Sequence, residues 1–284
     1  MIPAAFDYVA PTTLDEAVRA LAEAGEDGKV LAGGQSLLPV LRMRLAAPSK
    51  LIDLNKVAEL RGVREDGDAI VIGAMTTHYD VLRDSLVAEH AALLAEATGT
   101  VADPQIRHRG TFGGSLAHAD PAADLPAAAT AMDAEMVIAG PGGRRTVPVG
   151  EFFVDFFTTA LGPDEVLCEI RVPKRTGWHA HYEKFNRVAQ AWPIVAVAAT
   201  VRVDGGSIAE ARVGLANMGP TPVRATGVEQ ALVGQPATAE AIKAAAEHAA
   251  EGTNPPADGN ADAEFRQHLA RVLTSRAVSA AVGA

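Results

Sequence analysis

The sequence predicts an α+β fold, and three observations support this prediction. Short apolar runs alternate with helical patterns up to about residue 173. Two longer strand patterns then flank Asp204-Gly-Gly-Ser207, a glycine-rich turn of the kind that joins antiparallel strands. Helical patterns dominate from residue 227 onward. A chain whose strands return after each helix, and whose later strands form hairpins, belongs to the α+β class.

Length and charge limit the possible roles. The chain has 284 residues, so two or three subdomains with a substantial core are expected. Its formal net charge of -10 argues against a nucleic-acid partner, because binding phosphates needs a basic surface. Acidic residues occur early, and no apolar run approaches the ~20 residues of a membrane span. We therefore expect a cytoplasmic protein without a membrane span.

Cysteine and histidine usage excludes several kinds of site. Cys168 is the only cysteine, so an internal disulfide, an iron–sulfur cluster and a cysteine-based zinc site cannot form within this chain. Because Cys168 lies in an apolar strand pattern, we expect a buried thiol. The histidines lack zinc-ligand spacing, and no Gly-x-Ser-x-Gly nucleophile motif is present. Metal-site and hydrolase chemistry are therefore disfavoured.

Helices and strands alternate in the first part of the chain. Residues 13–24 form an amphipathic pattern, with Thr13 as N-cap and Glu16 placed to complete a capping box. A second capping pattern opens a helix at Thr77-His-Tyr-Asp80. Further helices are predicted at 85–97 and 125–132, and strands at 30–32, 51–54, 69–72, 136–139 and 145–149.

The pattern changes near residues 173–178, where a strand ends in Val-Pro-Lys-Arg-Thr-Gly. Antiparallel strands are predicted beyond this boundary at 181–187, 194–203 and 208–217. Helices follow at 227–232, 239–251 and 262–282. The second part of the chain is therefore predicted to be a smaller domain with a three-stranded antiparallel sheet and helices.

A glycine-rich stretch at residues 107–126 predicts a binding loop. Gly110, Gly113 and Gly114 permit positive φ and allow an anion to approach the main chain, while Thr111 and Ser115 add hydroxyl donors. Downstream, Asp124-Leu-Pro126 is typical of a helix start, whose N–H groups suit a phosphate. Taken alone, a Gly-Gly pair of this kind is also compatible with a simple turn.

A second stretch of the same type strengthens the ligand interpretation. A short apolar run leads into Gly33 and Gly34, followed by Gln35 and Ser36 as side-chain donors. Two such segments, 80 residues apart at Gly33 and Gly113, could hold a dinucleotide pyrophosphate between them. Neither matches Gly-x-Gly-x-x-Gly, so the Rossmann fingerprint is absent.

Together, Ala32-Gly-Gly-Gln-Ser36 and Thr111-Phe-Gly-Gly-Ser115 resemble the two FAD-binding signatures of the medium subunit of molybdenum hydroxylases. This is the aerobic carbon monoxide dehydrogenase and xanthine dehydrogenase group. The resemblance covers almost the whole chain and includes Gly73-Ala-Met-Thr76 and Tyr182-Glu-Lys-Phe185. It implies a two-lobed FAD-binding domain of the PCMH or vanillyl-alcohol-oxidase type at 1–176, with lobes of about 1–55 and 56–176. A C-terminal domain of the CO dehydrogenase flavoprotein type follows at 177–284.

The resemblance also implies non-covalent FAD and a set of contact residues. Asp124 would accept a hydrogen bond from a sugar or ribityl hydroxyl, or serve only as a helix cap. Leu167 would pack on the ring system, or be a plain core leucine. Lys184 would approach the ring and raise the flavin potential, or remain a solvated strand lysine, and Tyr182 on the same strand face could cover the ring. The implied cofactor-binding set is Ala32, Gly33, Gly34, Gln35, Ser36, Thr111, Phe112, Gly113, Gly114, Ser115, Asp124, Leu167 and Lys184.

The function implied by the resemblance is electron transfer in a three-subunit enzyme, carbon monoxide dehydrogenase-like. Electrons would pass from the [2Fe-2S] clusters of a small partner subunit through FAD to an external acceptor, after substrate oxidation at a molybdopterin centre in a large partner subunit. A dimer of such heterotrimers is expected. Two alternatives are an autonomous flavin-dependent reductase or oxidase of the same fold, and a flavin-less assembly module. Retention of both glycine segments argues against the second alternative.

Overall fold

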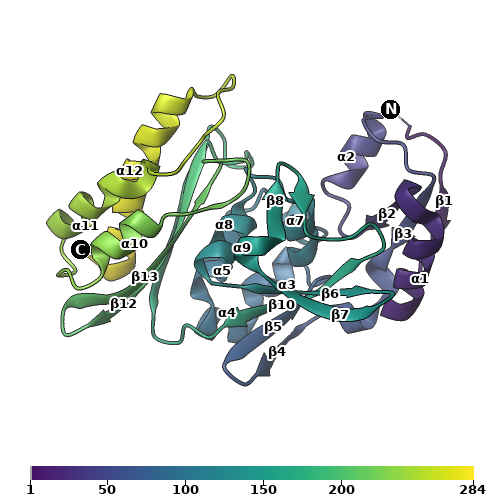
Figure 1. The fold of residues 1–284 in the computed structure, drawn as a ribbon, viewed down its shortest axis with the longest axis horizontal. Helices are drawn as coiled ribbons and strands as arrows, with labels where there is room; N and C mark the ends of the chain where they lie inside the picture. Colours follow the sequence, from purple (N-terminus) through teal and green to yellow (C-terminus); the bar gives the residue numbers. More distant parts are fainter. Residues whose placement is uncertain (1) are drawn as a thin grey trace.

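The computed structural model describes residues 2–284 and places the three larger of its four sheets along the length of the molecule (Figure 1). A small lobe with the amino terminus lies at one end, a five-stranded sheet with its helices lies in the middle, and the carboxyl-terminal sheet and helices lie at the other end. None of the helices in residues 2–284 is long and apolar enough to cross a membrane.

The amino-terminal lobe is a parallel sheet of order β1-β3-β2 with a helix packed on it. Thr13 caps α1 and Glu16 completes the predicted capping box. The helix then buries Leu14, Ala17 and Leu21 on one face. The elements are β1 Asp7–Val9, α1 Leu14–Ala24, β2 Gly28–Leu31, α2 Leu37–Arg42 and β3 Lys50–Asp53, with 3-10 turns at Gly25–Asp27, Leu54–Lys56 and Ala58–Leu60.

The middle of the chain forms an antiparallel sheet of order β4-β5-β10-β6-β7. Its strands are β4 Val63–Asp66, β5 Ala69–Gly73, β6 Glu135–Gly140, β7 Gly143–Pro148 and β10 Val166–Pro173. Met136 and Ile138 join the core under the helices, whereas Val137 and Ala139 join the core of the amino-terminal lobe. Because successive side chains of β6 point to opposite faces of the sheet, this strand packs into the cores of both lobes.

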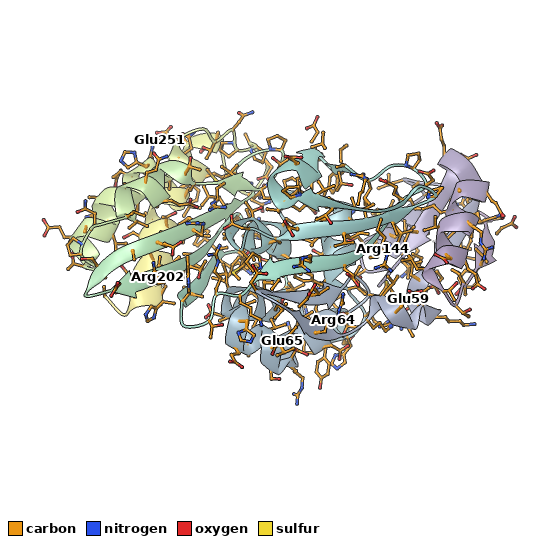
Figure 2. All side chains as sticks on the ribbon, turned by 60° about the horizontal axis from the view of Figure 1, so that its bottom comes forward. Glu59, Arg64, Glu65, Arg144, Arg202 and Glu251 are labelled. Carbon is orange, nitrogen blue, oxygen red and sulfur yellow. The ribbon has the colours of Figure 1, made fainter. Side chains whose placement is uncertain are left out.

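Ion pairs cover part of one face of this sheet, the face that is turned toward the viewer in Figure 2. Glu169 on β10 lies 3.0 Å from Arg64 on β4 and 3.8 Å from Arg144 on β7. Each pair reaches across an intervening strand. These half-exposed pairs keep the surface polar and contribute little to stability.

Short helices pack between the middle sheet and the carboxyl-terminal sheet. They are α3 His78–Arg83, α4 Ser85–His90, α5 Ala92–Gly99, α6 Pro104–Arg107, α7 Phe112–His118, α8 Asp124–Ala131 and α9 Val149–Phe152, with the ribbon β8 Phe153–Asp155 and β9 Thr158–Thr159. The prediction of one helix over 85–97 is wrong, because Ala91 leaves the helical region at φ -143 and ψ 46 and separates α4 from α5. No glycine or proline marks this break in the sequence.

The carboxyl-terminal sheet has four antiparallel strands, not the three predicted. The fourth strand is only two residues long, too short for an alternating pattern to reveal it. Otherwise the predicted strands and helices are present. They are β11 His179–Phe185, β12 Val195–Asp204, β13 Ser207–Ala216, β14 Val223–Arg224, α10 Thr226–Leu232, α11 Ala239–Ala246 and α12 Ala263–Val282, with a 3-10 turn at Glu247–Ala250.

The two faces of this sheet bury against different parts of the chain. Val195, Val197 and Val201 face a core built with α10, α11 and α12, whereas Ala196 and Ala198 join the core of the middle helices. Alanines allow α8 to approach the sheet closely, because they project little beyond the backbone. At Gly214 on β13 even a Cβ atom would overlap the carbonyl of Ala127 on α8. The amino-terminal and carboxyl-terminal halves therefore share a core.

Candidate functional site

The two glycine segments contact each other in the folded chain. A Cβ atom added to Gly33 would overlap the carbonyl of Arg109 and lie 2.7 Å from the Cα of Gly110. A Cβ added to Gly114 would lie 3.3 Å from the Cβ of Ala32. The structure thus brings together the segments that the sequence places 80 residues apart, as a shared ligand would require.

The glycines serve close approach more than unusual backbone angles. Gly34 has a φ of +78 and needs to be glycine for that reason. Gly110, Gly113 and Gly114 do not adopt the positive φ that glycine permits. A side chain on Gly113 would instead overlap Ala74.

The second segment is the start of a helix, not a loop. Thr111 caps α7, and its Oγ1 accepts a hydrogen bond from the N–H of Gly114 at 3.1 Å. The N–H groups of Phe112 and Gly113 donate at 2.9 Å to the carbonyls of Thr76 and Ala74, respectively. The first-turn amides of α7 are thus already paired within the protein.

The first segment offers the free donors. Within residues 2–284, no protein acceptor meets the backbone N–H of Gly33, Gly34, Gln35 or Ser36. The Gln35 amide makes a long 3.4 Å bond to the carbonyl of Gly33, and Ser36 is exposed. Consecutive unpaired amides next to a left-handed glycine form a concave backbone site that suits an anion.

A side-chain network that sequence patterns did not reveal holds the first segment in place. The Asn55 amide donates at 3.2 Å to the carbonyl of Ala32 and at 2.7 Å to Asp53 Oδ1. The hydroxyl of Tyr8 donates to the other Asp53 oxygen at 2.5 Å. Asp53 ends a buried strand, and a carboxylate at the end of such a strand was the sequence signal that could have revealed this network.

Asp124, Tyr182 and Lys184 form a buried cluster where α8 meets β11. Tyr182 Oη donates to Asp124 Oδ1 at 2.8 Å, and Lys184 Nζ lies 2.9 Å from Asp124 Oδ2. The ammonium also donates to the carbonyl of Thr100 at 3.1 Å. The side chains of Lys184 and Asp124 are each 6% exposed, so Lys184 is not a solvated strand lysine.

Two interpretations of this cluster are corrected by the geometry. Asp124 is not a helix cap, because the N-cap of α8 is Ala123 and makes no side-chain cap bond, while the Asp124 carboxylate points to β11. Tyr182 is 5% exposed and its ring lies in the core, so the polar group that it contributes to this cluster is its hydroxyl.

Burial controls the electrostatics of this cluster. Burial raises the pKa of Asp124, and the neighbouring Lys184 and Tyr182 oppose this rise without cancelling it. Burial raises the pKa of Tyr182 well above 10, and the adjacent Asp124 carboxylate adds to the effect. Tyr182 therefore remains a hydrogen-bond donor at neutral pH.

Phe112 and Leu167 are core residues. Phe112 is fully buried and anchors α7 in the core. Leu167 is 5% exposed and lies at a bulge in β10, in the same core cluster as Phe112 and Tyr182. A core position is thus the observed environment of Leu167.

A cavity of about 290 Å³ lies beside the segment that leads to Asp124. It opens between the α7–α8 connection, the β11–β12 connection and the start of α12. Trp192, 65% exposed, stands at this cavity. The lining includes Asp120, Ala122, Arg187, Trp192, Asn217 and Arg266.

These groups fit a flavin dinucleotide. Unpaired amides in the first segment suit a pyrophosphate, and the buried cluster on β11 supplies a cation and a hydroxyl for polar groups further along such a ligand. By contrast, residues 2–284 contain no group of three or more His, Cys, Asp or Glu that could hold a metal ion.

Comparison with known proteins agrees with this fit. Residues 4–175 match the family of FAD-binding domains in molybdopterin dehydrogenases, and residues 180–281 match the CO dehydrogenase flavoprotein C-terminal domain. The chain is 43% identical over 284 residues to the carbon monoxide dehydrogenase medium chain of Hydrogenophaga pseudoflava, covering 99% of this chain and 98% of that one. It is 36% identical to the 6-hydroxypseudooxynicotine dehydrogenase complex subunit alpha of Paenarthrobacter nicotinovorans, covering 99% and 96%.

A solved structure shows the same fold over the full length. The carbon monoxide dehydrogenase from Hydrogenophaga pseudoflava that lacks the Mo-pyranopterin moiety of its molybdenum cofactor superposes with a TM-score of 0.97 at 44% identity, covering 100% of this chain and 99% of that one. The two family models together match nearly all of the sequence, and the similarity to this structure extends over the full length. The chain belongs to the FAD-binding medium subunits of the molybdenum hydroxylase family, carbon monoxide dehydrogenase-like, and is an oxidoreductase subunit.

Proposed function

We propose that the chain binds FAD non-covalently across the two glycine segments, with the pyrophosphate on the unpaired amides of residues 33–36. The observation that carries this proposal is the direct contact of the two segments beside those free donors. The hydroxyls of Ser36 and Ser115 would add donors, and neither has a protein partner within residues 2–284. The proposed contact set is Ala32, Gly33, Gly34, Gln35, Ser36, Thr111, Gly113, Gly114 and Ser115, with Phe112 as the anchor of α7.

The ring end of the cofactor is proposed to lie near the cluster of Asp124, Tyr182 and Lys184, with Leu167 as an apolar neighbour. FAD accepts electrons from one partner and passes them to another. Lys184 would stabilise negative charge that develops near the N1 and C2-carbonyl edge. Since Asp124 already pairs with Lys184 at 2.9 Å, the cation acts as half of an ion pair, which moderates its effect on the potential.

We further propose that the chain operates with a large molybdopterin-binding subunit and a small [2Fe-2S] subunit, as a dimer of heterotrimers. Cys168 is the only thiol, and its Sγ donates to the carbonyl of Val137 in the core. Burial raises the pKa of Cys168 to about 11. The cysteine ligands of a [2Fe-2S] cluster that passes electrons to FAD would therefore come from a partner subunit. Relatives with this fold belong to enzymes named for different substrates, so the partner that carries molybdenum would select the substrate.

The division of the chain follows the matched regions. We propose a PCMH-type FAD-binding domain at 1–176, with lobes of about 1–55 and 56–176, and a C-terminal domain at 177–284. The supporting observations are the family matches to 4–175 and 180–281, and the separate sheets β1-β3-β2, β4-β5-β10-β6-β7 and β11-β12-β13-β14. A cytoplasmic location remains the expectation from the sequence.

Purification of the chain tests these proposals directly. We expect a visible flavin spectrum, and acid precipitation should release the yellow colour to the supernatant because attachment is not covalent. Dithionite should bleach the bound flavin. Carbon monoxide and N-heterocycles should not be oxidised until large and small subunits are added. Turnover of such a substrate by the purified chain alone would favour an autonomous flavoenzyme.

A further inference from the structure

Helix α8 ends at a cluster of charges. Asp133 follows the helix with a φ of 53, and three guanidinium groups converge on its carboxylate. Arg175 lies at 2.5 Å and Arg212 at 3.0 Å from Oδ2, and Arg224 lies at 2.6 Å from Oδ1. We call Asp133, Arg175, Arg212 and Arg224 the Asp133 cluster.

The Asp133 cluster joins different parts of the chain. Arg175 belongs to the connection between the two halves, Arg212 to β13 and Arg224 to β14. Arg224 also donates to the carbonyl of Thr130 on α8 at 3.2 Å and pairs with Glu229 on α10. Although burial raises the pKa of Asp133, hydrogen bonds and charge from Arg224 and Arg212 outweigh it, so the pKa is lowered. The carboxylate is therefore ionised at neutral pH.

The other end of α8 carries Asp124, which binds Lys184 and Tyr182 on β11. Just before the helix, the carbonyl of Pro121 accepts a hydrogen bond from the N–H of Asn217 at 2.8 Å. In the middle, Gly214 lets β13 lie directly against the backbone of Ala127. The helix is therefore held to the carboxyl-terminal sheet at both ends and in its centre, by groups that leave it little freedom to slide.

We propose that the Asp133 cluster is a positioning device for the flavin end of the site. It fixes α8 on the carboxyl-terminal sheet and thereby sets the alignment of Asp124 with Lys184. Asp124 and Asp133 are nine residues apart, roughly 14 Å along a helix axis. A short helix moves as one body, so loss of the clamp at one end displaces the carboxylate at the other. This inference rests on the proposed role of Asp124 and Lys184 beside the flavin.

Asp133→Asn in the full-length chain tests the proposal. Asparagine keeps the size of the side chain and tolerates the left-handed backbone, so the variant removes charge with little added strain. We expect the Kd for FAD to rise about tenfold, which is about 1.4 kcal/mol, and the flavin potential to shift. Arg64→Gln is the matched control. It breaks the exposed pair with Glu169 on the face of the middle sheet opposite the helices, and it should leave both properties unchanged.

A double-mutant cycle separates positioning from general weakening. Sites more than 7–10 Å apart normally contribute additively. If the Asp133 cluster acts through Asp124 and Lys184, Asp133→Asn should cost no further FAD affinity in a Lys184→Met background. Arg212→Gln removes only one of the three guanidinium groups, so it should lower FAD affinity by less than Asp133→Asn does. It replaces Asp133→Asn in the test if that variant does not fold.

The outcomes are distinct. A lower melting temperature with unchanged FAD affinity and potential in Asp133→Asn, or fully additive losses in the cycle, would overturn the positioning role alone. Lack of flavin binding by the wild-type chain would overturn the proposed function and this inference together.

Discussion

The two glycine segments have similar sequences and different structures. Residues 33–36 form a bend with unpaired amides, whereas residues 111–115 form the cap and first turn of α7, and the amides of residues 112–115 are bonded inside the protein. In the first segment the backbone is free to bind a ligand. In the second, small residues let α7 approach Ala74 closely. The comparison shows that a Gly-Gly pair can serve either contact with a ligand or contact with another part of the chain.

The largest effects should come from filling the space at these glycines. Gly113→Val places a branched side chain against the backbone of Ala74 in the central core, and we expect a loss of about 3 kcal/mol in the free energy of unfolding. Gly33→Val forces the two segments apart and should abolish FAD binding with a smaller loss of stability. Denaturant unfolding and flavin stoichiometry measure both effects.

Gly142→Val is the control for these variants, because a Cβ at Gly142 meets no atom within 4 Å and its φ is not positive. It should behave as wild type. Unchanged flavin stoichiometry in Gly33→Val would show that the segment contact has no bearing on the ligand.

Because the amides of α7 are already paired within the protein, we expect polar contacts to the flavin ring to come from β11. Lys184→Met tests this expectation. Removing the ammonium leaves the buried Asp124 carboxylate without its counter-ion, so we expect about 3 kcal/mol of destabilisation at neutral pH. The flavin reduction potential should fall, because reduced flavin loses a nearby cation. A redox titration against reference dyes reads the potential. An unshifted potential would place the ring away from Lys184.

A milder pair of variants sharpens the comparison between the segments. Thr111→Ala removes the cap of α7 and should cost about 1 kcal/mol of stability. Ser36→Ala removes an exposed hydroxyl without a protein partner, so stability should be unchanged while FAD affinity falls a few-fold. Thermal unfolding of the apoprotein and FAD titration separate the two effects. Equal effects of both variants on FAD affinity would contradict the division of roles.

The smallest expected effect is a pH dependence due to Asp124. Its pKa is raised in the folded chain, so its contribution favours folding below the unfolded pKa of about 3.9 and is lost as the pH rises through the folded pKa. Asp124→Asn should remove this part of the pH dependence, as seen by comparing urea unfolding of variant and wild type from pH 4 to pH 7. Identical pH profiles would mean that Asp124 keeps its ordinary pKa.

The amino-acid sequence by itself determined most helices and strands, and it marked the two glycine segments. Local signals suffice for α1, whose capping box lies within four residues, and for the turn at Asp204–Ser207, where two glycines permit positive φ. The glycine pairs and their neighbouring donors likewise stand out in the chain. Strand β14 and the break at Ala91 escaped detection, because two residues carry no periodicity and no glycine or proline marks the break.

Only the tertiary structure decided which groups at the site are free. Whether an amide binds a ligand depends on acceptors far away in sequence, as the bond from Phe112 to the carbonyl of Thr76 shows. The partner of Lys184 is Asp124, 60 residues away, and neither residue carries a local sign of the other. The Asp133 cluster gathers arginines from three separate segments. Such contacts arise when sheets and helices pack, and packing is a property of the whole chain.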